Sequence, residues 1–189
     1  MTARTIRVLD LFAGAGGLTA SFHTASPRFR SIAAVEMDPE AAASYRATFP
    51  KTDVYAGAIQ DWLAEGTIPT GVDVVVGGPP CQGFSTLGKR DAEDARNRLW
   101  EQYAQVIQRA RPKYFVVENV PAFGKSPQYR DFLAATRPGE FLEDYSFDFR
   151  VLNAADYGAP QARRRAVLIG HRNDMAVPGF PEPTHSPDG

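Results

Sequence analysis

The chain has 189 residues and 43% of them are hydrophobic, so it can bury one sizeable core and does not need a second full domain. Its formal charge of -1 and its pI near 6.3 argue against a protein that coats nucleic acid by bulk electrostatics. No apolar run approaches the roughly 20 residues of a membrane span. The one cysteine excludes an intrachain disulfide and a cysteine zinc site, so no metal is expected. Without an export signal, a free thiol indicates a cytoplasmic protein.

Short β-rich apolar runs alternate with helical patterns, which is typical of a parallel sheet with crossover helices. Asp38 is a candidate cap for the second helix, with Pro39 in its first turn. We expect an antiparallel end to the sheet, because the last two strands are joined only by a polar loop. The expected strands are 6–12, 31–35, 72–76, 114–117, 146–152 and 166–170, and the expected helices are 18–24, 39–48, 97–109 and 128–136.

A glycine-rich turn at residues 13–17 follows the first expected strand. Glycines there allow the backbone to approach a ligand at the start of a helix. Glu36 ends the next strand, where a carboxylate can bind both ribose hydroxyls. The spacing departs from the dinucleotide fingerprint, so it favours an adenosine with a sulfonium tail over NAD. Met37 is a candidate to pack on the adenine. A plain tight turn and an ordinary core methionine are the alternative interpretations.

Cys81 lies in the run 77–85, Gly-Gly-Pro-Pro-Cys-Gln-Gly-Phe-Ser, directly after an apolar strand. A lone cysteine is most often a small buried hydrophobe. Core packing, however, needs neither two prolines that fix the backbone nor glycines that permit turns. An open α/β sheet places its ligands at the carboxyl ends of its strands. The placement therefore favours Cys81 as a nucleophile.

Four segments in chain order resemble the motifs of the DNA (cytosine-5)-methyltransferases. They are 10–18, 77–85, Glu118-Asn119-Val120 and Gln161-Ala162-Arg163-Arg164-Arg165, and 94–99 resembles a further family segment. The resemblance implies a doubly wound, Rossmann-like methyltransferase sheet with an antiparallel end over residues 1–177. It implies S-adenosylmethionine as cofactor and S-adenosylhomocysteine as product. The expected cofactor-binding residues are Phe12, Ala13, Gly14, Gly16, Gly17, Leu18, Glu36, Met37, Ile59 and Pro79.

The resemblance also implies a covalent mechanism for methyl transfer to cytosine. Cys81 adds to C6, which gives C5 the character of an enamine, and Glu118 acts as an acid toward N3. Arg165 contacts the base oxygen and Glu118, whereas Arg163 stabilises the adduct. Along an extended segment the side chains of these two arginines point the same way and Arg164 points the opposite way. No side chain is an obvious base for the C5 proton, so ordered water is expected to take it.

A stacked base cannot undergo this chemistry, so the resemblance implies that the cytosine of duplex DNA is flipped into the site. Residues 82–89 would then form a loop over the base. Gln82 and Ser85 are expected DNA contacts, with Ser85 on a backbone phosphate. Lys89 and Arg90 are either further phosphate contacts or ordinary solvated cations.

Two departures from the family pattern bear on activity. Gly57-Ala58-Ile59 stands where the family usually has Gly-Asp-Ile, so Ala58 cannot accept from the adenine amino group. The Ile59 amide remains available, and Asp61 is a weaker substitute. In addition, 180–185 resembles the lead into the target-recognition region, which makes 178–189 a linker toward an absent part. Either the chain is a fragment, or a second polypeptide supplies the recognition region and the last motifs.

Three functions follow from these observations. The leading one is a DNA cytosine C5 methyltransferase of a restriction-modification system that needs the missing recognition part. The alternative within the enzyme class is methylation of cytosine in tRNA. The alternative from another class is a catalytically silent module that binds a cofactor or a partner.

Overall fold

A seven-stranded sheet with the order β3-β2-β1-β4-β5-β7-β6 organises the protein. The computed structural model describes residues 4–66, 68–80 and 99–185. The pairs from β3 to β5 are parallel, and β7 is antiparallel to both of its neighbours, which confirms the predicted antiparallel end. The strands are β1 (Ile6–Leu11), β2 (Phe29–Glu36), β3 (Asp53–Ala56), β4 (Val74–Gly77), β5 (Tyr114–Asn119), β6 (Tyr145–Asn153) and β7 (Arg164–Arg172).

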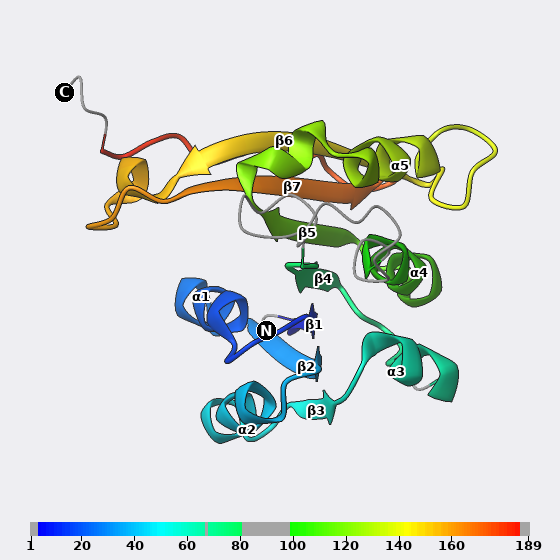
Figure 1. Cartoon of the computed structure of the whole chain (residues 1–189), viewed down its shortest axis with the longest axis vertical. Coiled ribbons are helices and arrows are strands. Elements are labelled where there is room, and N and C mark those ends of the chain that lie inside the picture. Colours follow the sequence, from blue (N-terminus) through cyan, green and yellow to red (C-terminus); the bar gives the residue numbers. More distant parts are fainter. Residues whose placement is uncertain (1–3, 67, 81–98, 186–189) are drawn as a thin grey trace, which may run out of the picture.

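Helices cover both faces of the sheet, as expected for the doubly wound architecture (Figure 1). Helices α1 (Gly17–Ala25) and α2 (Pro39–Thr48) lie on one face, and α3 (Ile59–Glu65), α4 (Leu99–Ala110) and α5 (Pro127–Ala135) lie on the other. The predicted cap of α2 is confirmed, since Asp38 Oδ1 accepts from the amides of Glu40 at 2.9 Å and Ala41 at 2.8 Å.

The main core lies between the sheet and α3, α4 and α5. Leu9, Val75 and Phe115 from neighbouring strands are fully buried there, against Tyr103 of α4 and Phe132 of α5. Because parallel strands are buried on both faces, these central strands are largely apolar, and Asp10 of β1 is a buried exception. This core fixes the ends of β1, β4 and β5 at one edge of the sheet.

The other face is covered unevenly. Phe22 of α1 packs against Val8 and Val74 of the central strands. Beside this contact lies a cavity of about 390 Å³, whose lining includes Ile6, Phe29, Val74, Tyr114 and Val116. We call this the open apolar face. Within the described residues, α1 and α2 are the helices on this side of the sheet.

Several elements differ from the sequence predictions. Strand β1 ends at Leu11, not at Phe12, because Phe12 has a φ of 54°, which a strand does not accommodate. Strand β3 and helix α3 were not expected as clear elements. Two short 3₁₀ helices, η3 (Pro121–Lys125) and η4 (Ala154–Tyr157), follow β5 and β6.

The proline-rich segment after residue 178 is extended and lies against η4. The amides of Thr184 and His185 each donate to the carbonyl of Asp156 at 2.9 Å, and the Tyr157 hydroxyl donates to the carbonyl of Pro181 at 3.2 Å. The segment predicted as a linker therefore makes specific contacts as far as His185.

The described residues contain neither a membrane-spanning helix nor a cluster of metal ligands. No helix in this part of the chain is long and apolar enough to cross a membrane. No group of three or more His, Cys, Asp or Glu side chains in it is placed to hold a metal ion.

Candidate active site

Two cavities meet at residues 78–80, directly after β4. The first cavity measures about 210 Å³ and lies at the carboxyl ends of β1, β2 and β3, and the second, also about 210 Å³, lies at the end of β5. Gly78 and Pro80 line both, so a single stretch of backbone forms their common wall. The first cavity is lined by Phe12, Val35, Glu36, Met37, Gly57, Ala58, Ile59, Gln60, Gly78, Pro80 and Leu99. The second is lined by Gly78, Pro79, Pro80, Glu118, Asn119, Val120, Arg163 and Arg165.

Glu36 holds the glycine-rich turn beside the first cavity. Its Oε2 accepts from the Gly14 amide at 2.7 Å, and its Oε1 accepts from the Asp38 amide at 2.8 Å. A carboxylate has about four acceptor positions, so each oxygen of Glu36 keeps one free. Two free acceptors on one carboxylate fit the two hydroxyls of a ribose, the role predicted for Glu36.

The turn itself has an unusual backbone. Phe12, Gly14 and Gly16 all have positive φ, at 54°, 54° and 93°. Gly16 also packs against the rings of Tyr45 and Phe49, and a Cβ there would lie 3.0 Å from Tyr45 Cδ2 and closer still to Phe49. Only glycine combines this φ with this approach, so Gly16 lets the turn pack closely against Tyr45 and Phe49.

The far end of the first cavity suits a flat, apolar ring. Met37 is 72% exposed although it lines the cavity, and Ile59 is buried. Ile59 is the first residue of α3, so its amide has no partner within the helix. Ala58 is the N-cap and provides no side-chain cap. The Ile59 amide is therefore free to donate at this end of the cavity, and Asp61 is not among the lining residues.

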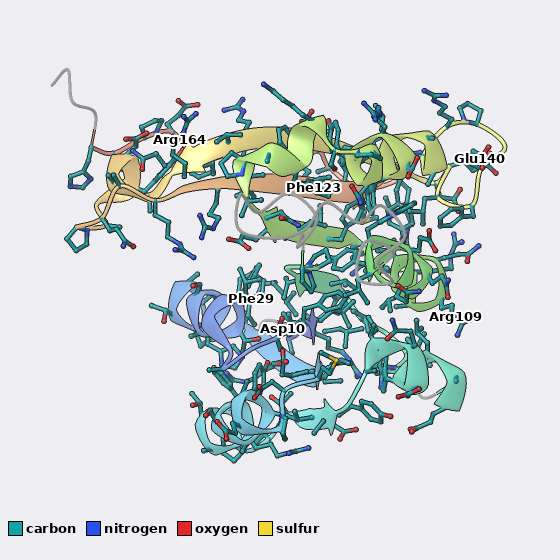
Figure 2. All side chains as sticks on the ribbon, viewed as in Figure 1. Asp10, Phe29, Arg109, Phe123, Glu140 and Arg164 are labelled. Carbon is teal, nitrogen blue, oxygen red and sulfur yellow. The ribbon has the colours of Figure 1, made fainter. Side chains whose placement is uncertain are left out.

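An ion pair crosses the second cavity. Arg165 Nε lies 2.8 Å from Glu118 Oε1, which is the contact predicted between these two residues. The antiparallel register produces it, because β5 ends at the point where β7 begins. Both side chains remain about one-third exposed, so the pair stays open to a substrate. Arg163 also lines the cavity, whereas Arg164 does not; Figure 2 shows Arg164 at the end of the β6–β7 pair.

Asn119 is a residue of the second cavity that the sequence analysis missed. Its Nδ2 donates to the Pro79 carbonyl at 2.9 Å, and its Oδ1 accepts from the Val120 amide at 2.8 Å. This buried amide ties the end of β5 to the loop after β4. A Cβ on Gly78 would lie 3.2 Å from Glu118 Oε2, so the glycine permits that approach. The sequence contains one sign of this role, since Asn119 is a polar residue that directly follows Glu118 at the end of the strand.

The structure brings together part of the predicted set. Phe12, Glu36, Met37 and Ile59 line the first cavity, while Glu118, Arg163, Arg165 and Pro79 line the second. Pro79 was predicted for the cofactor and thus lies on the other side of the common wall. Ala13 and Leu18 pack into the protein interior, and Gly14, Gly16 and Gly17 shape the turn. Cys81, Gln82, Ser85, Lys89 and Arg90 lie outside the described residues.

Comparison with known proteins identifies the family of this arrangement. The model of the C-5 cytosine-specific DNA methylases matches residues 6–188. The chain belongs to this family. It is 43% identical over 185 residues to the Type II methyltransferase M.XorII of Xanthomonas oryzae, and 39% identical over 189 residues to M1.HphI of Haemophilus parahaemolyticus.

A solved structure agrees with this assignment. The crystal structure of a putative DNA modification methyltransferase encoded within an E. coli prophage shares 27% sequence identity over 96% of the chain, with a TM-score of 0.72. The methylase chain nevertheless spans about half of these proteins, 43% of M.XorII, 50% of M1.HphI and 53% of the prophage enzyme. The matched half contains both cavities.

Proposed function

We propose that this chain is the catalytic half of a DNA cytosine methyltransferase that transfers a methyl group from S-adenosylmethionine to C5 of cytosine in duplex DNA, as part of a restriction-modification system in the cytoplasm. The common wall of Gly78 and Pro80 carries the proposal. It separates a cavity suited to a nucleoside from one that holds a paired carboxylate and guanidinium. A methyl donor and a base on either side of this wall would be close neighbours.

The first cavity fits the cofactor by its donors and acceptors. Glu36 would bind the ribose hydroxyls, the Ile59 amide would serve an adenine nitrogen, and Met37 and Phe12 would contact the ring. The glycine turn would approach the amino-acid end. When bound, S-adenosylmethionine supplies an electrophilic methyl group, and S-adenosylhomocysteine is the product.

The second cavity would hold the flipped cytosine. We assign Cys81 as the nucleophile, since it follows Pro80 directly in the chain. Its thiolate would form a bond to C6, while Glu118 supplies a hydrogen to N3 and so draws electrons from the ring. Arg165 would hold Glu118 and the base oxygen, and Arg163 would stabilise the adduct. C5 would then form a bond to the methyl group as the carbon–sulfur bond of the sulfonium breaks. Loss of the C5 proton to water would expel the thiolate, return the N3 hydrogen to Glu118 and restore the aromatic ring.

We propose that the rest of the enzyme comes either from a C-terminal continuation or from a second polypeptide. The open apolar face supports this, because parallel strands are normally covered on both sides. A further helix of the missing part would cover Tyr114 and Val116 there. That part would also carry the surface that reads bases in the major groove, with Gln82 and Ser85 as contacts from this chain.

Methyl transfer with labelled S-adenosylmethionine tests the proposal. The full protein is incubated separately with duplex DNA that contains many cytosine contexts and with tRNA. We expect label on C5 of cytosine in the DNA and none on the tRNA. Label on tRNA alone would favour the tRNA alternative. Cofactor binding without transfer to either, in the presence of every component of the enzyme, would favour a silent module.

Ala58 offers a gain-of-function test of the cofactor site. Ala58→Asp restores an acceptor for the adenine amino group, so affinity for S-adenosylhomocysteine should rise about 2- to 12-fold, as for one added hydrogen bond. The same carboxylate caps α3, which should stabilise the protein by about 1 kcal/mol. Calorimetric binding and thermal unfolding measure the two effects.

Ala58→Ser is the matched control for this experiment. Serine caps a helix as well as aspartate does, but it is shorter and uncharged. It should therefore stabilise α3 and leave the affinity nearly unchanged. If both variants stabilise the protein and neither binds more tightly, adenine does not lie beside residue 58.

A further inference from the structure

Asp10 is a buried carboxylate that the proposed chemistry does not use. It is fully buried in β1, with its side chain on the α1 side of the sheet, and Figure 2 shows it inside the molecule and not at the rim. Its Oδ2 accepts from the Thr19 hydroxyl at 2.8 Å, while its Oδ1 has no hydrogen-bond partner among the described residues. Since a buried unpaired carboxylate oxygen is costly, its retention calls for a reason.

A chain of hydroxyl groups points toward Asp10. The Tyr45 hydroxyl lies 2.7 Å from that of Thr19 and 2.8 Å from that of Ser31. Each hydroxyl has one hydrogen to donate. Because the hydrogen of Thr19 goes to Asp10, Tyr45 must donate to Thr19, and Ser31 must donate to Tyr45. Three consecutive donors aimed at one carboxylate stabilise its charged form.

Helix α1 lacks a cap of its own. Its N-cap, Gly16, provides no side-chain hydrogen bond, and its first turn contains no acidic residue. Thr19 is the third residue of the helix, and its hydroxyl donates to Asp10. A negative charge near the start of a helix is favourable, so Asp10 supplies from β1 what the helix sequence lacks.

The contact between Asp10 and Thr19 closes a loop around the strained turn. Between them lie Phe12, Gly14 and Gly16, the three residues with positive φ. Such conformations persist only where the surroundings over-determine them. Glu36 of β2 holds the same turn through the Gly14 amide. Asp10 of β1 holds it through the Thr19 hydroxyl.

We propose that Asp10 is a positioning residue of the methyltransferase, whose carboxylate binds the Thr19 hydroxyl in the first turn of α1 and so holds the glycine turn in the shape that lines the cofactor cavity. This inference rests on the proposed cofactor site. It adds a residue that would not touch the cofactor.

The surroundings of Asp10 make its charge depend on pH near neutrality. Burial raises the pKa of Asp10 to about 7; hydrogen bonding from Thr19 lowers it, and the charge of Glu36 on β2 raises it. The titratable groups that face this site from the packed elements include Tyr45 of α2 and Tyr103 of α4, and burial raises the pKa of each above 10. His23 of α1 accepts from the Ser31 amide, and burial and the charge of Arg30 lower its pKa from 6.5. Asp10 is therefore the group near the turn that would change its charge near pH 7.

Binding of S-adenosylhomocysteine by the full protein tests the positioning role. In the wild type, affinity should rise roughly three- to tenfold between pH 6 and pH 8, as Asp10 gains its charge. Asp10→Asn should bind at the low-pH wild-type level throughout, with no such rise. Thr19→Val should weaken binding similarly, because it removes the hydroxyl donor.

Tyr45→Phe is a graded comparison, since it keeps the ring that contacts Gly16 and removes the second hydroxyl of the chain, which does not itself touch Asp10. It should keep most of the high-pH affinity and a pH dependence whose midpoint moves to higher pH. Equal affinity and an equal pH profile in wild type and Asp10→Asn would overturn the proposal. So would a loss of binding in Asp10→Asn that accompanies unfolding of the whole sheet while Thr19→Val binds normally.

Stability provides an opposite signature. The folded-state pKa of Asp10 lies above its ordinary value of 3.8, so its contribution to stability is full below pH 3.8 and is lost as pH rises through 7. Wild-type stability should fall as pH rises from 3.8 to about 7, so most of the fall precedes the rise in affinity, and Asp10→Asn should lack this fall. A purely structural role would move both quantities in the same direction.

Amide hydrogen exchange of the cofactor-free protein separates this inference from the proposed function. Asp10→Asn should speed exchange at Ala13, Gly14 and Gly16, whose amides donate to Val35, Glu36 and Ala13, and leave β4 and β5 unchanged. If the wild type does not bind S-adenosylhomocysteine, the cofactor site fails, while the exchange result still decides whether Asp10 holds the turn.

Discussion

Cys81→Ser is expected to abolish the covalent complex between the enzyme and duplex DNA that contains 5-fluorocytosine. A fluorine at C5 cannot leave as a proton does, so an enzyme that attacks C6 becomes trapped on the base. A serine hydroxyl ionises far less readily than a thiol and does not replace the thiolate as a nucleophile. Denaturing electrophoresis measures the complex, which should be absent from the variant.

The single cysteine of this sequence makes a second readout possible. Alkylation of the wild-type thiol should block methyl transfer to the same extent as the substitution, and Cys81→Ser should be indifferent to the reagent. Cofactor affinity should stay within about twofold, because no role at the cofactor is assigned to this side chain. An adduct that persists in the variant would exclude Cys81 as the attacking group.

Glu118→Gln is expected to lower the rate of methyl transfer by about 10²- to 10⁴-fold, the range for loss of an acid in the transition state. The amide keeps the size of the side chain and an oxygen that accepts from Arg165, but it cannot deliver a proton to N3. Single-turnover transfer from labelled cofactor measures the effect. Glu118 does not line the first cavity, so cofactor affinity should be unchanged.

The arginines of β7 provide matched controls for Glu118. Arg165→Ala removes the ion pair to Glu118 and should also slow transfer, whereas Arg164→Ala should not, since Arg164 lies outside the cavity. A rate for Glu118→Gln within threefold of the wild type would refute the role of Glu118 as an acid. Equal effects of the two arginine variants would indicate a contribution from charge alone.

The sequence predicted the parallel strands and the antiparallel end from local patterns, and the resemblance to the family predicted the pairing of Arg165 with Glu118. The central strands are largely apolar, and most of the motif residues stand at strand ends. Strand β3 and helix α3 were missed as clear elements, since four and seven residues give too little periodicity. Strand β1 ends where Phe12 takes a positive φ. The sequence does not reveal this, because phenylalanine is common in strands and predicts a continued strand.

The positioning residues are harder to predict for a physical reason. Asn119 acts on Pro79, and Asp10 acts on Thr19, through hydrogen bonds that exist only after distant strands and helices have packed. In the sequence, each is one polar residue beside an apolar run. The contacts of 178–185 with η4 are likewise tertiary and leave no periodic signal.

The antiparallel return of β7 also has a consequence for synthesis on the ribosome. Every described residue that lines the first cavity lies at or before Leu99, so this lining is synthesised before β5. The lining of the second cavity is incomplete until Arg163 and Arg165 have been synthesised, which happens only after β6. Because folding can begin from the N-terminus during translation, the donor site can form before the acceptor site. A chain truncated before β7 would therefore keep the lining of the first cavity but lack Arg163 and Arg165, which the second cavity needs to act on the base.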